Sequence, residues 1–131
     1  MPLRIHGLTH VAIQVAHLDR SLGFYQRLFG SEVVYRDEKT IELRTPGRRD
    51  ALTLELGDGP EPGAAGGVGT PQGGVLHFGF RLLMPASPDE IAIAVTQAGG
   101  IVEDRGEFVL GEPYVFARDP DGYLIEVFFE P

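Results

Sequence analysis

The chain has 131 residues, a net charge of −8 at pH 7 and no cysteine. Its length indicates a single domain with a hydrophobic core, and its acidic charge argues against nucleic acid or an anionic membrane as a partner. It contains neither an apolar stretch of membrane length nor the apolar core of a signal peptide, and it can form no disulfide, so we expect a cytoplasmic protein.

The first predicted element is a strand over residues 7–15, where apolar and other side chains alternate. Its apolar face must pack on another element, while His10 and Gln14 lie on the opposite face. A helix is predicted next, over residues 20–29, with Asp19 as its N-cap because a carboxylate accepts an unpaired backbone N–H. A glycine follows this segment and is a natural stop for the helix.

Three further strands complete the first half of the chain. The pattern predicts them over residues 32–36, 40–45 and 51–56. In the last of these, three leucines alternate with Thr53 and Glu55, so these two polar residues lie on the face opposite the leucines.

Residues 57–74 separate two similar halves. Eleven of these eighteen residues are Gly or Pro and the segment has no periodicity, which predicts a linker or loop. After it the pattern of residues 7–15 returns over residues 74–82, with the glycine, the histidine and the apolar face 67 residues further on. His77 is therefore the counterpart of His10.

The second half repeats the order of the first. Ser87 and Glu90 form a capping box around Pro88, which predicts a helix that ends near residue 98. Three strands follow, over residues 101–105, 112–118 and 123–129.

Glu126 lies in the middle of the last strand and shares its face with Leu124 and Phe128. A carboxylate between apolar neighbours is costly to bury unless something positive meets it, so Glu126 faces solvent on an edge strand or a metal ion. A shift of 71 residues aligns Leu-Glu-Leu in the first half with Ile-Glu-Val in the second, which makes Glu55 the counterpart of Glu126.

We therefore predict an α+β fold in a single domain over residues 1–131, built from two tandem βαβββ modules over about residues 5–57 and 74–131. If the helices cover the apolar faces, the opposite faces line a common surface. A curved mixed sheet whose halves close on each other would then bring the two histidines and the two glutamates into one metal-containing cleft.

Several short motifs occur together in this chain. They are Gly-Leu-Thr-His at 7–10, His-Leu-Asp-Arg-Ser-Leu-Gly-Phe-Tyr at 17–25, Leu-Phe-Gly at 28–30, Leu-His-Phe at 76–78 and Asp-Pro-Asp-Gly-Tyr-Leu-Ile-Glu at 119–126. Together they resemble the vicinal oxygen chelate superfamily of glyoxalases, bleomycin-resistance proteins and extradiol dioxygenases. The resemblance implies paired modules around a divalent metal, and a homodimer whose cavity is sometimes built across two chains.

The resemblance implies His10, His77 and Glu126 as metal ligands, with Glu55 where glyoxalase-type members place a fourth. Two imidazoles with one or two carboxylates suit Fe(II), Mn, Ni, Co or Zn. With one carboxylate, open positions remain where adjacent oxygens of a substrate can chelate, and the metal acts on them as a Lewis acid. The alternatives are exposed or structural histidines, and a solvated strand face at Thr53 and Glu55.

Five further side chains would share the faces of the candidate ligands and are candidate substrate contacts: Gln14, Arg44, Tyr114, Phe116 and Arg118. Glutathione-using glyoxalases typically carry Arg in place of Gln14 and Asn in place of Gly59, which argues against glutathione as a substrate. Extradiol dioxygenases typically carry Tyr in place of Phe116 and a further His upstream of it, whereas no His follows His77 here.

The leading hypothesis is a metal-dependent lyase or isomerase acting on a small oxygenated molecule, with Glu55 or Glu126 transferring a proton. A ring-cleaving dioxygenase is the second hypothesis. The third is a metal-free protein that sequesters an aromatic or cationic drug, which the acidic charge would favour. The sequence leaves open whether the site lies within one chain or between two.

Overall fold

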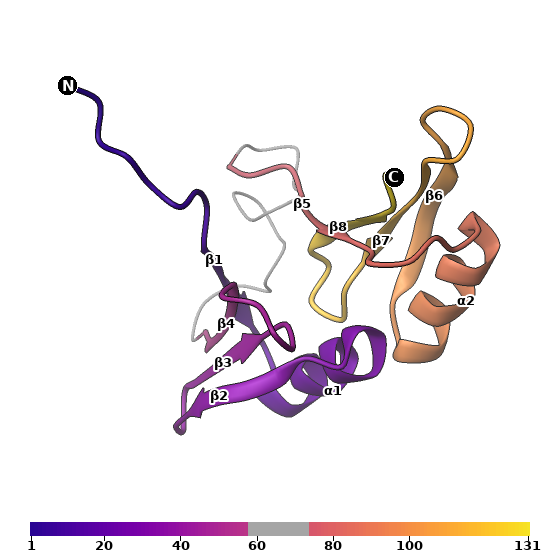
Figure 1. Ribbon diagram of the computed structural model, residues 1–131. Coiled ribbons are helices and arrows are strands. Elements are labelled where there is room, and N and C mark those ends of the chain that lie inside the picture. Colours follow the sequence, from indigo (N-terminus) through magenta and orange to yellow (C-terminus); the bar gives the residue numbers. More distant parts are fainter. Residues whose placement is uncertain (58–73) are drawn as a thin grey trace.

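The structure is a computed structural model that describes residues 1–57 and 74–131. These residues form two helices and two four-stranded sheets (Figure 1). The first module contains β1 (His10–Val15), α1 (Leu18–Phe29), β2 (Glu32–Arg36), β3 (Thr40–Arg44) and β4 (Ala51–Leu56). The second contains β5 (Phe78–Arg81), α2 (Pro88–Ala98), β6 (Ile101–Glu107), β7 (Pro113–Arg118) and β8 (Leu124–Phe128). The predicted α+β fold with tandem βαβββ modules is confirmed, and most of the predicted linker, with Gly59, lies outside the described residues.

Both modules have the same sheet topology. The strand order is β1-β4-β3-β2 in the first sheet and β5-β8-β7-β6 in the second. The first and last strands of each module pair in parallel, and the remaining neighbours are antiparallel. Each module therefore places the strand that begins at or just after its histidine next to the strand that carries its glutamate. Neither helix of the described residues has the length and apolarity needed to cross a membrane.

The start of α1 differs from the prediction. The helix begins at Leu18 and is preceded by His17, whose side chain makes no capping hydrogen bond. Asp19 is therefore not the N-cap: it lies in the first turn, and its carboxylate accepts a hydrogen bond from Arg36 at 2.8 Å. An acidic side chain in the first turn still interacts favourably with the helix dipole. The predicted stop at Gly30 is confirmed, since this glycine has φ 67° in the left-handed region.

The second helix begins and ends as predicted. Ser87 accepts a hydrogen bond from the backbone N–H of Glu90 at 3.1 Å, Pro88 is the first helical residue and Gly99 follows the last turn with φ 104°. The strand before it is shorter than predicted, so His77 precedes β5 by one residue.

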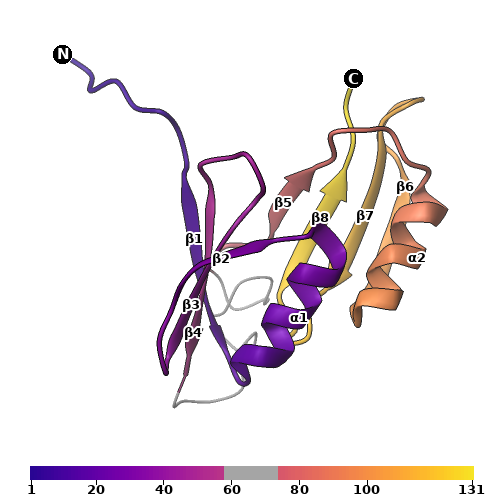
Figure 2. The same ribbon diagram turned by 60° about the horizontal axis from the view of Figure 1, so that its bottom comes forward.

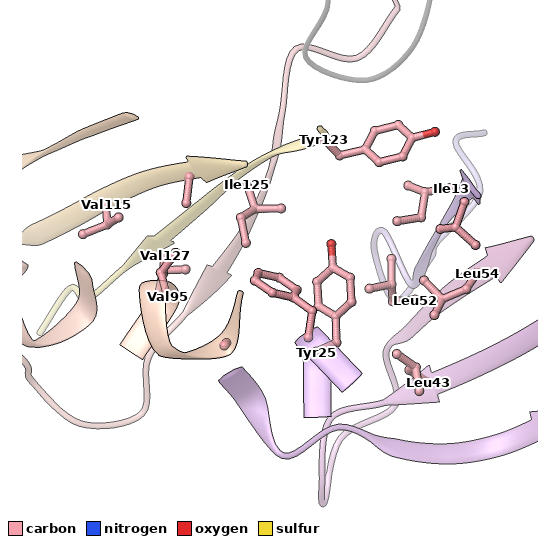
Figure 3. Packing of buried hydrophobic residues seen from close by; sticks show 14 of the residues in the cluster. Ile13, Tyr25, Leu43, Leu52, Leu54, Val95, Val115, Tyr123, Ile125 and Val127 are labelled. Atoms are coloured by element: carbon pink, nitrogen blue, oxygen red, sulfur yellow. The ribbon is translucent and has the colours of Figure 1, made fainter. Parts of the chain in front are cut away.

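Helix α1 lies between the two sheets, as the views in Figure 1 and Figure 2 agree. Its Phe24 and Tyr25 are fully buried in a cluster that contains side chains from both modules. The Tyr25 ring centroid lies 6.3 Å from that of Phe80 on β5, and the Phe29 centroid lies 4.2 Å from it. Figure 3 shows Tyr25 between Leu54 on one side and the second module on the other. Helix α1 therefore packs against the sheet of its own module and also against the second module.

Asp121 is the polar centre of the contact between the modules. Its carboxylate accepts hydrogen bonds from the backbone N–H of Ala16 at 2.9 Å, from Arg20 at 2.9 Å and from the Ser21 hydroxyl at 2.5 Å. All three donors belong to the first module, about a hundred residues earlier in the chain. The Asp-Pro-Asp-Gly segment, predicted only as a turn, therefore also joins the modules.

Asp119 makes the second polar contact of this turn. It accepts hydrogen bonds from the Tyr25 hydroxyl at 2.7 Å and from the backbone N–H groups of Asp121 and Tyr123. Burial raises the pKa of the Asp119 carboxyl to about 6, although the hydrogen bonds from Tyr25 and Tyr123 act in the opposite direction. Burial, followed by the neighbouring Asp119, raises the pKa of Tyr25 well above its ordinary value.

Candidate metal-binding and substrate-binding faces

The candidate site residues lie on the faces of the two sheets that point away from the core, here called the outer faces. The first outer face is formed by His10, Ala12, Gln14, Thr40, Glu42, Arg44, Ala51, Thr53 and Glu55, and the second by Gly79, Tyr114, Phe116, Arg118, Leu124, Glu126 and Phe128. Helix α1 and the shared core pack against the opposite, apolar faces of the two sheets.

On the second outer face, two of the predicted ligands lie next to Phe116. Glu126 on β8 pairs with Gly79 on β5 and with Phe116 on β7. His77 lies just before β5, and its ring meets that of Phe116 edge-on at a centroid distance of 5.1 Å. A Cβ atom at Gly79 would lie 3.4 Å from Glu126 Oε1, so the glycine keeps the space beside this carboxylate open. His77 and Glu126 therefore both lie beside Phe116 on the second outer face.

The first outer face presents His10 without a matching carboxylate beside it. Its Nδ1 lies 3.2 Å from the Thr9 hydroxyl oxygen, which leaves Nε2 as the nitrogen available to a ligand. In the register, Ala12 pairs with Thr53, and Glu55 pairs with Gln14 one pleat further along the strands. Gln14 in turn packs against Gly57, where a Cβ atom would collide with its side chain.

This register corrects the predicted equivalence of Glu55 and Glu126. Gly79 is the counterpart of Ala12, and Gly79 pairs with Glu126 whereas Ala12 pairs with Thr53. Thr53 therefore occupies the place that corresponds to Glu126, and Glu55 lies two residues away, roughly 6.6 Å along the strand. Side chains alternate with a period of two, so a slip of two residues preserves the pattern and misled the sequence comparison.

A complete ligand set is not assembled within the described part of one chain. Across residues 1–57 and 74–131, no group of three His, Cys, Asp or Glu side chains is arranged to hold a metal ion. His10 and His77 do line one pocket of about 560 Å³ between the modules, but Glu126 and Glu55 are not among its lining residues. The predicted single cleft with all four side chains is therefore not formed by these residues of one chain.

Aromatic rings continue along the second outer face from His77. Phe116 meets Tyr114 at a centroid distance of 5.6 Å, and Tyr114 stacks on Phe108 at 4.3 Å. The Tyr114 hydroxyl donates a hydrogen bond to Asp104 at 3.2 Å, and desolvation and this carboxylate raise the pKa of Tyr114. Phe108 was not predicted from the sequence, although its apolar neighbours in a turn segment were the available signal.

The two candidate arginines differ in their surroundings. Arg118 donates hydrogen bonds to Glu103 at 2.7 Å and to the carbonyl oxygen of Gly122 at 3.1 Å. Arg44, on the first outer face, has no hydrogen bond or ion pair with another described residue, and Glu32, directly opposite it on β2, does not reach it. Arg118 is thus committed to its own module, whereas Arg44 is available to a ligand.

Comparison with known proteins identifies the class. The family model described as the Glyoxalase/Bleomycin resistance protein/Dioxygenase superfamily matches residues 7–127, and the chain belongs to this superfamily. A catechol-2,3-dioxygenase of Bacillus subtilis is 31% identical over 129 residues, which are 95% of this chain and 42% of the relative, so the chain spans less than half of that protein.

Solved structures agree with this assignment. A lactoylglutathione lyase from Agrobacterium tumefaciens is 25% identical, with a TM-score of 0.69 and coverage of 96% of this chain and 95% of that chain. A fosfomycin resistance protein, FosX, from Listeria monocytogenes is 21% identical, with a TM-score of 0.73. The match covers 98% of this chain and 96% of the FosX chain. At this identity the second likeness shows the fold alone.

Proposed function

We propose that the protein is a metal-dependent enzyme whose centre is formed by His10, His77 and Glu126. The observation that carries this proposal is the register of the sheets, which puts Thr53 where a second carboxylate would complete a four-ligand set. Two imidazoles and one carboxylate with open positions are typical of non-haem Fe(II) enzymes. The bound metal would supply Lewis acidity toward adjacent oxygens of a small substrate.

The centre is completed by a second copy of the chain. The first outer face of one copy, with His10, meets the second outer face of the other, with His77 and Glu126. The described residues of one chain hold no group of three His, Asp or Glu side chains arranged for a metal ion, which supports this arrangement. A two-fold dimer would contain two equivalent centres, because each copy offers both faces.

Ring-cleaving or related dioxygenase chemistry now ranks above lyase or isomerase chemistry. Glu55 lies two residues along its strand from the position that corresponds to Glu126, so we give it no place at the centre, and the lyase hypothesis keeps only Glu126 for proton transfer. The similarity to a catechol-2,3-dioxygenase favours an oxygenase. With Phe116 in place of a tyrosine, Tyr114 offers a hydroxyl on that face, and its ring meets that of Phe116 at a centroid distance of 5.6 Å.

Metal content tests the ligand assignment directly. Elemental mass spectrometry of protein purified without chelator should find near-stoichiometric metal in the wild type and in Glu55→Gln, and a loss of metal in His77→Ala. Fe or Mn in the wild type, with oxygen uptake on catechols after anaerobic Fe(II) loading, would support the dioxygenase, and Ni, Co or Zn the lyase. If no metal binds even after loading, the remaining hypothesis is a drug-binding protein.

Mixing two inactive variants tests the second-copy arrangement. His10→Ala and Glu126→Ala each destroy every centre in their own homodimer. In a mixed dimer, the His10 of one copy meets the intact His77 and Glu126 of the other, so one centre per dimer should recover metal. A centre contained in one chain would gain nothing on mixing, and equal metal content before and after mixing would exclude the arrangement.

A further inference from the structure

A pocket on the first outer face carries two arginines beside the candidate ligand His10. Its volume is about 390 Å³, and its lining includes His10, Arg44, Arg49 and Ala51. Arg44 also lines the larger pocket that contains both candidate histidines. The arginines therefore border the position at which a substrate would reach the proposed centre.

The floor of this pocket is a cross-strand row with a small residue in its middle. His10 pairs with Ala51, and the register of β3 with β4, continued by one residue, puts Arg44 on the other side of Ala51. Two strand spacings separate the His10 and Arg44 backbones, roughly 10 Å, with only a methyl group between them. In the second module, Leu124 fills the corresponding position next to Arg118. The space above the middle residue of this row is therefore open at Ala51 in the first module and filled by Leu124 in the second.

Neither guanidinium in the pocket is neutralised by the described residues. Arg44 and Arg49 have no ion pair among residues 1–57 and 74–131. The chain has 19 acidic and 11 basic residues, so carboxylates are plentiful, and Arg118 in the matching position does hold Glu103. Both guanidinium groups are exposed and, among the described residues, unpaired, so both are able to bind an anion from outside the chain.

Two carboxylates lie in the same pocket and define its polarity. Both oxygens of Asp50 accept hydrogen bonds from Thr45, one from its backbone N–H at 2.8 Å and one from its hydroxyl at 2.7 Å. Glu42 lies one row further along, beside Thr53. The pocket lining thus holds two carboxylates beside its two guanidinium groups, which favours a singly charged anion over a phosphate dianion.

We propose that Arg44 and Arg49 bind a carboxylate group of the substrate, next to His10 and over Ala51. This inference rests on the proposed function only in placing the substrate's reacting oxygens at the neighbouring centre. An arginine fork matches a carboxylate with two parallel hydrogen bonds, which fixes the orientation of the ligand as well as its position. The substrate class is thus a small oxygenated carboxylic acid, and the aromatic rings of the opposing face suit one that contains a ring.

Binding of benzoate to the full-length protein tests this proposal, with neutral benzamide as its uncharged counterpart. Titration of ¹⁵N-labelled protein should shift the backbone signals of Ala51 and Arg44, and binding should weaken with added salt. Arg44→Gln should weaken benzoate about tenfold or more, since a hydrogen-bonded charged group is lost. Arg48→Gln is the matched control, because Arg48 lies four residues after Arg44, in the exposed segment between β3 and β4, but does not line the pocket.

Each contrary outcome overturns the inference. Equal binding of benzoate and benzamide would show that charge is not recognised, and an equal loss in Arg48→Gln would show only general attraction. Tighter binding of inorganic phosphate than of benzoate would identify a phosphate site instead. The His77→Ala variant separates the two proposals: if benzoate still binds through Arg44 in that variant while no metal binds to the wild type, the carboxylate site stands and the metal centre fails.

Discussion

The two outer faces share one backbone plan and differ in chemistry at almost every matched position. Thr53 pairs with Ala12 in the first module, and at the matching position of the second module Glu126 pairs with Gly79. Ala51 in the first module corresponds to Leu124 in the second. Arg44 has no partner among the described residues, whereas its counterpart Arg118 is held by Glu103. The first face is polar and open, and the second is aromatic and carries the carboxylate. The two modules thus carry different side chains on the same backbone plan, which suits the proposed site formed where unlike faces of two copies meet.

The largest expected effect is a difference in metal binding between the matched positions. His77→Ala and Glu126→Ala should lose the metal, and Thr53→Val should keep it, although Thr53 occupies the place of Glu126 in the other module. The reason is that only imidazole and carboxylate groups on these faces are suitable ligands. Elemental mass spectrometry of the three variants measures the effect, and a loss of metal in Thr53→Val would break the comparison.

Thr53→Glu sharpens the same comparison. It gives the first face the carboxylate that the second one has, at the corresponding place in the register. A fourth ligand should raise affinity for Zn or Ni and fill a position that a substrate would use, so oxygen uptake with Fe(II) should fall about tenfold or more. The measurement is metal affinity by competition with a chelator, beside turnover. Glu55→Asp is the control, since this carboxylate lies two residues further along the strand, and unchanged turnover in Thr53→Glu would contradict the assignment.

The next effect concerns the hydrogen bonds of Asp121 that join the two modules. Asp121→Ala should lower the free energy of unfolding by about 3 kcal/mol, because the buried Ser21 hydroxyl and the Ala16 N–H lose their acceptor. Asp19→Ala removes another aspartate–arginine pair, but its side chain is 80% exposed, so it should cost less than about 1 kcal/mol. Urea unfolding followed by circular dichroism measures both, and similar losses in the two variants would show that the turn does not join the modules.

Asp119 makes this contact depend on pH. Its folded-state pKa of about 6 lies above the ordinary value of 3.8, so its contribution is fully present below pH 3.8 and is lost as the pH rises through about 6. Asp119→Asn removes this titration and keeps an oxygen that can accept the backbone hydrogen bonds. Relative to the variant, the wild type should lose up to roughly 3 kcal/mol between pH 4 and pH 7. Urea unfolding of both proteins across this range is the measurement, and parallel curves would contradict it.

The sequence predicted elements and faces because these depend on neighbours in the chain. Alternation assigned His10 and Glu126 to the faces opposite the apolar stripes, and the Ser87 cap fixed the start of α2. The alternation has a period of two, so it does not distinguish Glu55 from Thr53 as the counterpart of Glu126. Register is decided by hydrogen bonding between strands, which no local pattern records.

The local sequence pattern also could not predict which elements pack against the apolar face of each sheet. Helix α1 was predicted to cover its own sheet, but its Tyr25 also packs against the second module. The donors to Asp121 lie 100 to 105 residues earlier in the chain, so the motif indicated only a turn. The single cleft expected from the sequence is not formed by the described part of one chain, because the pocket that His10 and His77 share includes neither of the candidate glutamates.

The smallest expected effect is on the space beside Glu126. Gly79→Ala makes the second face match the first at this position, where Ala12 stands. The new Cβ would lie 3.4 Å from Glu126 Oε1, at ordinary contact distance, and Gly79 is not among the glycines with positive φ. Stability should therefore change by less than about 1 kcal/mol, whereas metal affinity should fall about tenfold because the carboxylate loses its freedom to turn toward the ligand position. Affinity and urea unfolding measured together separate the two effects, and unchanged affinity would mean that the metal approaches Glu126 from the Phe116 side.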